Sequence, residues 1–201
     1  MLALAWLMSY LVGSCPSAYL LVRLVKGTDI RTVGSGNVGA TNAARAVGPW
    51  AGLVVLAADV LKGVAASTLV PRVFLHDVSP AMALSCGLAA VIGHDAPVWL
   101  RFRGGKGVAT TIGALAAGQP LVAGVMVGVW AVVFAGWRYV SVASMAGALA
   151  IPLALLARHR PSSEVLAGAA LALLIVAQHR ANVQRLLAGA EPRGFSRVVK
   201  H

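Results

Sequence analysis

Charged side chains are scarce in this sequence of 201 residues, and acidic ones are scarcer still. Only 11% of the residues are charged, Asp and Glu together number 6, and 59% of the residues are hydrophobic. An ordinary soluble domain is about 25% charged and about 45 to 50% apolar. This composition excludes an ordinary water-soluble domain and predicts an all-α protein that crosses a membrane several times.

Cysteine is also rare, and no motif of metal ligands is present. Cys15 and Cys86 lie in apolar surroundings, without a CxxC motif or a histidine at ligand spacing, so buried thiols are expected in place of a disulfide or a metal site. We expect no cofactor. The first ten residues lack the Lys and Arg of a signal peptide, and residues 2 to 25 are therefore interpreted as a retained first span.

Basic residues are the one excess, with a net charge of +11. They alternate with apolar spans and do not form a stripe with interleaved aromatics, so no nucleic-acid partner is expected. The positive-inside bias and attraction to anionic membrane lipid explain such a charge pattern.

Seven apolar segments predict about seven transmembrane helices in a single integral membrane domain that covers residues 1–201. The fourth segment is short, because 12 residues make about 18 Å of helix and the hydrocarbon core is about 30 Å thick. Joined to the fifth across Gly118-Gln119-Pro120, it would make a helix of about 46 Å, too long without strong tilt or a kink. The predicted spans are 2–25, 50–71, 80–97, 107–118, 120–137, 139–157 and 163–179.

With seven spans, the polar stretches 26–49, 98–106 and 180–201 fall on one membrane face. The positive-inside rule makes this face cytoplasmic, with the N-terminus outside and the C-terminus in the cytoplasm. The opposite face has only Arg72, Arg158 and Arg160. The basic residues of the cytoplasmic face are Arg23, Lys26, Arg31, Arg45, Arg101, Arg103, Lys106, Arg138, Arg180, Arg185, Arg193, Arg197 and Lys200.

Each of these polar stretches contains a segment suited to phosphate. Residues 34–45 read GSGNVGATNAAR, in which glycines permit close backbone approach, a helix start offers free N–H groups and Arg45 can clamp an anion. The alternative is a tight turn with capping Ser and Asn residues.

Residues 104–107 read GGKG, a loop that can converge on phosphate oxygens. It is not a Walker A motif, and juxtamembrane anchoring by Lys106 is its alternative.

The third segment begins at His179, where the last span ends. His179 and Asn182 share a helix face at i and i+3 and could meet one ligand, although a histidine there can also be a simple cap.

Asp59 and Lys62 lie inside the second span at a spacing that permits an ion pair. A paired scaffold, a part in the site and an ion path are all open for them.

Taken in order, three patterns resemble the bacterial acyl-phosphate:glycerol-3-phosphate acyltransferase (PlsY) family. They are SGNxGATNxxR from Ser35, GGKGVAT from Gly104 and HRxNxxRLLxGxE from His179. The resemblance covers residues 35–191 and extends to Asp59–Gly63 and Arg138–Ser144. It implies a seven-span enzyme of the bacterial inner membrane with its site on the cytoplasmic face. Such an enzyme moves a fatty acyl group from acyl phosphate to the 1-hydroxyl of glycerol 3-phosphate, without a metal, giving lysophosphatidic acid for phospholipid synthesis.

The resemblance also implies roles for individual residues. Gly104, Gly105 and Gly107 would shape the glycerol phosphate pocket. The donor phosphate would lie against main-chain amides from Gly39 through Ala40 and Thr41 to Asn42, with Asn37 holding that loop. The polar site would be lined by Ser35, Arg45, Lys106, Ser144, His179 and Asn182.

The mechanism follows from the two anionic substrates. Acyl phosphate is already activated, so direct transfer without an acyl-enzyme is expected, with catalysis by positioning and electrostatics. The group that removes the hydroxyl proton is either His179 or a substrate phosphate, and the family resemblance favours the phosphate. A functional link to the enzyme that makes acyl phosphate is a further expectation. The rival classes are a carrier of phosphorylated molecules, which needs a midplane site reached from both sides, and a membrane scaffold.

Overall fold

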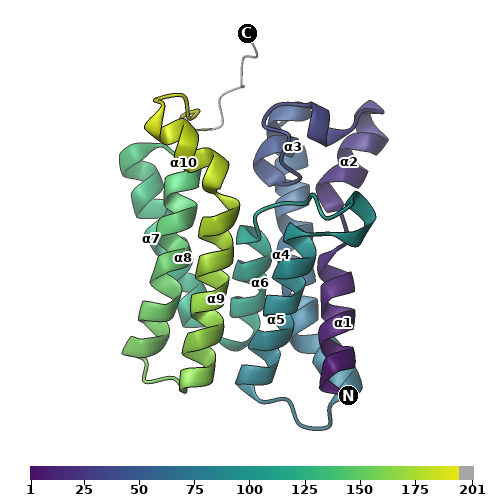
Figure 1. Ribbon diagram of the computed structural model, residues 1–201, viewed down its shortest axis with the longest axis vertical. Helices are drawn as coiled ribbons and strands as arrows, with labels where there is room; N and C mark the ends of the chain where they lie inside the picture. The colour runs from purple at the N-terminus through teal and green to yellow at the C-terminus, as the bar shows by residue number, and fades with distance from the viewer. Residues whose placement is uncertain (195–201) are drawn as a thin grey trace.

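The computed structural model describes residues 1–194, which fold into helices that run along one long axis (Figure 1). The N-terminus lies at one end of this axis, and the last helix lies at the other. Arg197 and Lys200 of the predicted basic face are outside the described residues. The helices are α1 (Leu2–Gly13), α2 (Ser17–Lys26), α3 (Ala40–Ala46), α4 (Pro49–Phe74), α5 (Pro80–Asp95), α6 (Val108–Gly118), α7 (Pro120–Trp137), α8 (Val140–Ala157), α9 (Ser162–Gln178) and α10 (Arg180–Leu187), with 3₁₀ turns η1 (Ile30–Thr32) and η2 (Val98–Leu100).

The predicted all-α membrane protein is confirmed, and each of the seven predicted segments is helical. Five helical segments of residues 1–194 are candidate spans by themselves, and α9 together with α10, bent by 52° at their junction, is a sixth. The sidedness of the membrane stays a prediction. Within residues 1–194, the helices long and apolar enough to cross a membrane are Leu2–Lys26, Pro49–Phe74, Pro80–Leu100, Pro120–Trp137 and Val140–Ala157.

Helix α6 is too short to cross the membrane by itself, as its predicted length suggested. It has 11 residues, about 16 Å of helix. The connection between α5 and α6 lies partway along the bundle, so α6 begins inside the bundle (Figure 1). The predicted break at Gln119 is confirmed, and the Gln119 side chain donates to Glu164 at 2.5 Å, so the buried turn finds its partner on α9.

The first span is not one continuous helix. Helix α1 ends at Gly13 and α2 begins after Pro16, whose ring has no N–H to continue the ladder. The carbonyl of Cys15 in this break accepts a hydrogen bond from Lys62 Nζ at 3.2 Å. A buried lysine therefore satisfies a main-chain group that the break exposes.

Glycines let α4 and α6 pack with their backbones in close approach. A Cβ atom placed on Gly63 would lie 2.9 Å from the Ala114 nitrogen, and one on Gly113 would lie 3.0 Å from the Val64 nitrogen. Small residues at such crossings are typical of membrane helices. This packing fixes α6, and with it the loop from which α6 starts.

We predict that Gly63→Val separates α4 from α6 and destabilises the protein by about 1 to 3 kcal/mol, since the new side chain overfills a backbone contact. Thermal unfolding of the purified protein in detergent measures the loss. Gly124→Val on α7 is the matched control, because a Cβ there would have no atom within 4 Å. Equal unfolding temperatures for the two variants would contradict the packing.

Candidate functional site

The first polar segment is a loop wrapped around the Asn42 side chain, which is 1% exposed. Asn42 Oδ1 accepts from the main-chain nitrogen of Ser35 at 3.0 Å, while Nδ2 donates to the carbonyls of Val33 and Asn37 at 3.0 Å each. The predicted holder of this loop was Asn37, but Asn37 contributes only its carbonyl to this network. The Asn42 amide, at the first turn of α3, satisfies several main-chain groups of the loop at once.

The second segment is the glycine loop, residues 101–107, which lies on the end of α5. The main-chain nitrogen of Gly104 donates to the Asp95 carbonyl at 3.1 Å, and that of Gly105 donates to the His94 carbonyl at 3.0 Å. Gly107, with φ of +72°, precedes the first turn of α6 in a left-handed conformation that favours glycine. The loop is thus held by main-chain bonds and leaves the Lys106 side chain to reach across the bundle.

The third segment meets Lys106. Lys106 Nζ donates to Asn182 Oδ1, and Asn182 Nδ2 donates to Glu191 Oε1 at 2.6 Å. Glu191 also accepts from Ser141 Oγ at 2.7 Å and from Arg185 Nε at 2.8 Å. The Glu191 carboxylate therefore fixes the Asn182 amide, and this amide holds the lysine.

Arg45 completes a cationic group. One Arg45 amino group donates to the Gly194 carbonyl at 3.5 Å, whereas Arg45 Nε is buried and has no hydrogen-bond partner within residues 1–194. Arg45 and Arg185 both act electrostatically on Lys106. Three cations thus face the single carboxylate of Glu191, and this excess of positive charge with an unpartnered donor suits a phosphate anion.

Burial lowers the pKa of the Lys106 ammonium to about 8. Glu191 opposes this shift, while Arg185 and Arg45 add to it. An ammonium poised in this way gains most from an anion, because the anion supplies the counter-charge that water supplies elsewhere.

His179 lies 3% exposed at the junction of α9 and α10. Its Nδ1 lies 2.7 Å from the Ile175 carbonyl, which can only accept, so Nδ1 carries the proton and Nε2 presents its lone pair. This tautomer leaves one ring nitrogen able to accept a proton from a substrate.

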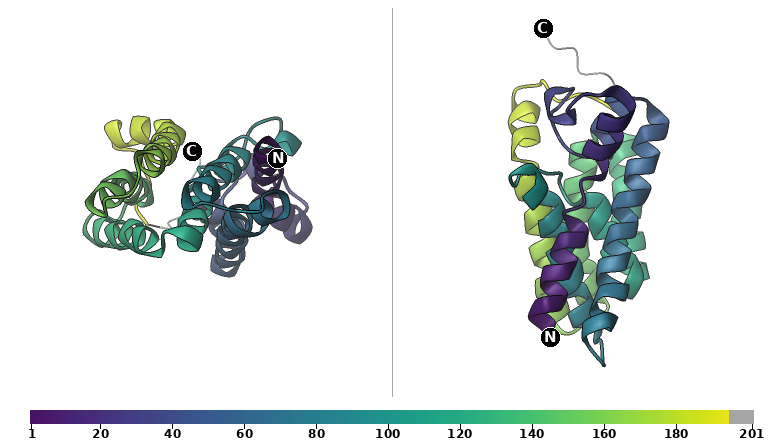
Figure 2. Two further views of the ribbon diagram at one scale, coloured as in Figure 1. Left: turned by 90° about the horizontal axis from the view of Figure 1, so that it is seen from below. Right: turned by 90° about the vertical axis from the view of Figure 1, so that its right-hand side faces the viewer.

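Contacts join some predicted site residues and not others. The three segments meet at one end of the bundle, where α3 and α10 lie (Figures 1 and 2). The hydrogen bond from Lys106 to Asn182 joins the second to the third, and Arg45 of the first donates to the segment after α10. The views of Figure 2 show α7 to α9 grouped beside the earlier helices. Ser35 is exposed, and no hydrogen bond among the described residues ties Ser35 or Thr41 side chains to this group.

Ser144 is buried on α8, where it accepts from Trp130 Nε1 at 3.3 Å. Ser141, one turn earlier on α8, is the serine that reaches Glu191, and it was not among the predicted site residues. The motif spacing gave no signal to choose between the two serines, because the choice depends on where the segment after α10 returns.

Fold and site together define an integral membrane protein with a cationic, phosphate-suited site at one end of its bundle. Residues 3–189 match the model of the glycerol-3-phosphate acyltransferase family. A glycerol-3-phosphate acyltransferase of Desulforudis audaxviator (strain MP104C) is 46% identical over 186 residues, which cover 92% of each chain. One of Trichormus variabilis (strain ATCC 29413 / PCC 7937) is 41% identical over 199 residues, covering 92% of this chain and 88% of the relative.

Solved structures agree with these relatives. The crystal structure of PlsY (YgiH), an integral membrane glycerol 3-phosphate acyltransferase, in its glycerol 3-phosphate form is similar with a TM-score of 0.88 and 38% identity. The match covers 96% of this chain and 94% of that one. The lysophosphatidic acid form gives a TM-score of 0.84 at 36% identity. The chain belongs to the glycerol-3-phosphate acyltransferase family.

We predict that Glu191 stabilises the fold in a pH-dependent way. Burial alone would raise the pKa of this carboxyl, but hydrogen bonds from Ser141, Asn182 and Arg185 outweigh burial and lower the pKa. Its stabilisation is therefore full above the ordinary glutamic acid pKa of about 4.3 and is lost as pH falls through the lowered value.

Thermal unfolding of the wild type and of Glu191→Gln measures this effect. The two unfolding temperatures should differ near neutral pH and converge in acid. A difference that is constant over the whole pH range would show that the ionised carboxylate is not what stabilises.

Proposed function

We propose that this protein transfers a fatty acyl group from acyl phosphate to the 1-hydroxyl of glycerol 3-phosphate and releases lysophosphatidic acid and phosphate. The observation that carries the proposal is the partly buried cationic group of Arg45, Lys106 and Arg185. Within residues 1–194 its Arg45 Nε is buried and has no hydrogen-bond partner. Both substrates are phosphate anions, so such a site can hold both and offset their mutual repulsion.

Glycerol 3-phosphate binds at the glycine loop. Its phosphate lies against Lys106 and the backbone of Gly104, Gly105 and Gly107, where the absence of side chains permits close approach. Asn182 keeps the lysine extended toward this phosphate, since the amide is itself fixed by Glu191. The names of the solved relatives support this substrate, because one was crystallised in a glycerol 3-phosphate form.

The donor binds on the other side of the site. Its phosphate lies against Arg45, Ser35 and the main-chain amides from Gly39 through Ala40 and Thr41 to Asn42, and its acyl chain runs between helices into lipid. In this arrangement Asn37 and Ser144 support the pocket and do not touch the reacting atoms. The loop wrapped around Asn42 supports the placement, because Asn42 and Arg45 lie at i and i+3 on α3 and so share a face of that helix.

Transfer is direct. The 1-hydroxyl oxygen bonds to the acyl carbon, the bond from that carbon to the phosphate oxygen breaks, and phosphate leaves with the electron pair. The hydroxyl proton passes either to a phosphate oxygen or to His179 Nε2, which is left free by the bond from Nδ1 to Ile175. Because acyl phosphate is already activated, the step needs no acyl-enzyme, metal or cofactor.

The reaction takes place on the cytoplasmic face of the bacterial inner membrane. Its donor must come from an enzyme that forms acyl phosphate, and a functional link between the two enzymes follows from the chemistry of the donor.

We predict that the purified protein, given glycerol 3-phosphate without a metal, forms lysophosphatidic acid from palmitoyl phosphate and not from palmitoyl-CoA. Arg45→Ala should lower kcat/KM by about a hundredfold, as expected when a charge-assisted contact to a reacting anion is lost. Mass spectrometry of the product measures the rates. Activity with the thioester alone would overturn the donor, and no product from either donor would favour a carrier of phosphorylated molecules.

We further predict that the KM for glycerol 3-phosphate rises above pH 8, because the pKa of Lys106 is lowered to about 8 and the neutral amine no longer attracts phosphate. In Lys106→Arg the guanidinium stays charged, so its KM should change little between about pH 7 and about pH 10. Initial rates at several substrate concentrations measure both profiles. A wild-type KM that does not change over this range would contradict the role of Lys106.

A further inference from the structure

Three ionisable side chains from α4 and α5 form a buried cluster beside the break between α1 and α2. Lys62 Nζ lies 2.8 Å from Asp59 Oδ1 and 2.7 Å from His94 Nδ1. Ser17 Oγ donates to the same Asp59 oxygen at 2.6 Å. The predicted pair of Asp59 and Lys62 is confirmed, and His94, for which no role was predicted, belongs to the same cluster.

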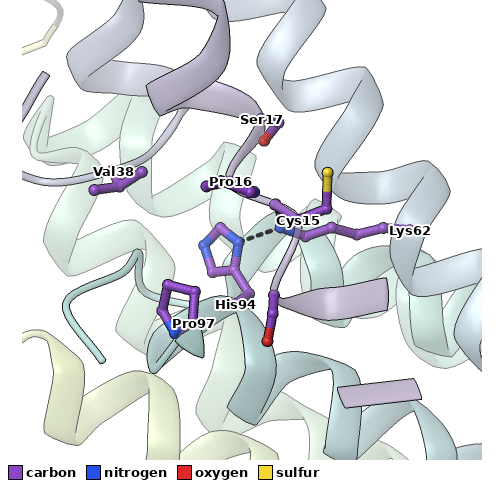
Figure 3. Close-up of a pocket in the computed structure, with 8 residues that line it drawn as sticks. Cys15, Pro16, Ser17, Val38, Lys62, His94 and Pro97 are labelled. Atoms are coloured by element: carbon purple, nitrogen blue, oxygen red, sulfur yellow. Dashed lines mark hydrogen bonds between the residues drawn. The ribbon is translucent and has the colours of Figure 1, made fainter. Parts of the chain in front are cut away.

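The bonds of Lys62 fix the state of His94. An ammonium group has three protons and no lone pair, and its partners here are the Asp59 carboxylate, the Cys15 carbonyl and His94 Nδ1. Nδ1 must therefore accept, so the imidazole is neutral and carries its proton on Nε2. Figure 3 shows the Lys62 and His94 side chains converging at this point.

The cluster leaves little room for the ring to move. His94 and Lys62 line a cavity of only about 10 Å³ together with Val38 and Pro97, close to the volume that one water needs. His94 itself is 8% exposed. A buried ring that accepts a hydrogen bond from Lys62 at Nδ1 therefore has little freedom to move.

The far edge of that ring lies directly beneath the glycine loop. A Cβ atom on Gly105 would lie 2.7 Å from His94 Cε1 and 2.8 Å from Cδ2, and it would also overlap Nε2. The main-chain nitrogens of Gly104 and Gly105 donate to the carbonyls at the end of the same helix. The loop therefore rests on both the backbone and the ring of His94, one residue before Lys106.

We infer that His94, held in place by Asp59 and Lys62, is a positioning residue for the glycine loop. Its ring fixes how far the loop lies from the end of α5, and so places the Lys106 ammonium at the phosphate of glycerol 3-phosphate. This inference rests on the proposed function for the identity of the substrate. It assigns the buried charges of α4 to one of the two substrate pockets and leaves the donor pocket at α3 unaffected.

The test compares the wild type, His94→Asn, Gly105→Ala and the double variant. Asparagine keeps an acceptor for Lys62 but removes the ring edge below the loop. Gly105→Ala should raise the KM for glycerol 3-phosphate about tenfold by displacing Lys106, with little change in the KM for acyl phosphate. His94→Asn should raise the same KM, and adding Gly105→Ala to it should have little further effect, because the methyl group then has room.

Glu164→Gln is the control for general destabilisation, since it weakens the bonds that the buried Glu164 carboxylate accepts from Gln119 and Arg160 at the far end of the bundle. It should lower the unfolding temperature and leave both KM values unchanged. Independent, multiplying effects of the His94 and Gly105 substitutions, or equal changes in the two KM values, would overturn the inference.

Lys62→Met tests the cluster itself, because it removes the donor at His94 Nδ1. We expect a higher KM for glycerol 3-phosphate and an unchanged KM for acyl phosphate. A lower unfolding temperature with both KM values unchanged would show that the cluster only supports the helix break.

Thermal unfolding of the same four His94 and Gly105 proteins separates this inference from the proposed function. If the wild type makes no lysophosphatidic acid, the proposed function fails, but the contact is still measured. Gly105→Ala should then lower the unfolding temperature clearly more in the wild type than in His94→Asn. Equal decreases would overturn the contact between ring and loop.

Discussion

The hydrogen bond between the Lys106 ammonium and the Asn182 amide connects two of the three polar segments of the site, the glycine loop and the segment that begins at His179. Lys106 stands on a loop that the packing of α4, α5 and α6 holds in place, whereas Asn182 follows the last long helix. The direction of this bond depends on the orientation of the Asn182 amide. Glu191 fixes that orientation, because it accepts hydrogen bonds from Asn182, Ser141 and Arg185. One carboxylate, placed after α10, thus orients a lysine that is 85 residues earlier in the chain.

Burial gives these few charges their effect. In water an exposed lysine and a phosphate attract each other weakly, but a partly desolvated lysine is short of counter-charge and gains more from an anion. The same reasoning explains why Asp59 and Lys62 are paired inside α4, since an unpaired charge at that depth is costly. The first arrangement leaves a cation available to substrate, and the second uses up every donor of its lysine on protein atoms.

Much of the fold could be predicted from the sequence. Hydropathy indicates which segments lie in lipid and which in water, and helix-breaking residues mark where helices end. The helical segments, the break at Gln119, the convergence of the polar motifs and the pairing of Asp59 with Lys62 all followed from residue type and spacing. The break at Pro16, the role of Asn42 in place of Asn37, and the choice of Ser141 over Ser144 did not. These depend on where distant segments return, and spacing along one helix carries no information about that. No role could be predicted for His94, because one of its partners, Lys62, lies 32 residues earlier and the other, Gly105, lies on the far side of a turn.

The central claim is that the three polar motifs form one phosphate site in which Lys106 holds glycerol 3-phosphate. A crystal structure of the protein with glycerol 3-phosphate bound, in a lipidic phase, tests it most directly. The account predicts the phosphate within hydrogen-bonding distance of Lys106 Nζ and of the Gly104–Gly107 backbone, with the 1-hydroxyl directed toward Arg45 and His179. A phosphate bound only at the exposed arginines of the surface, with Lys106 still bonded to Asn182 alone, would contradict it.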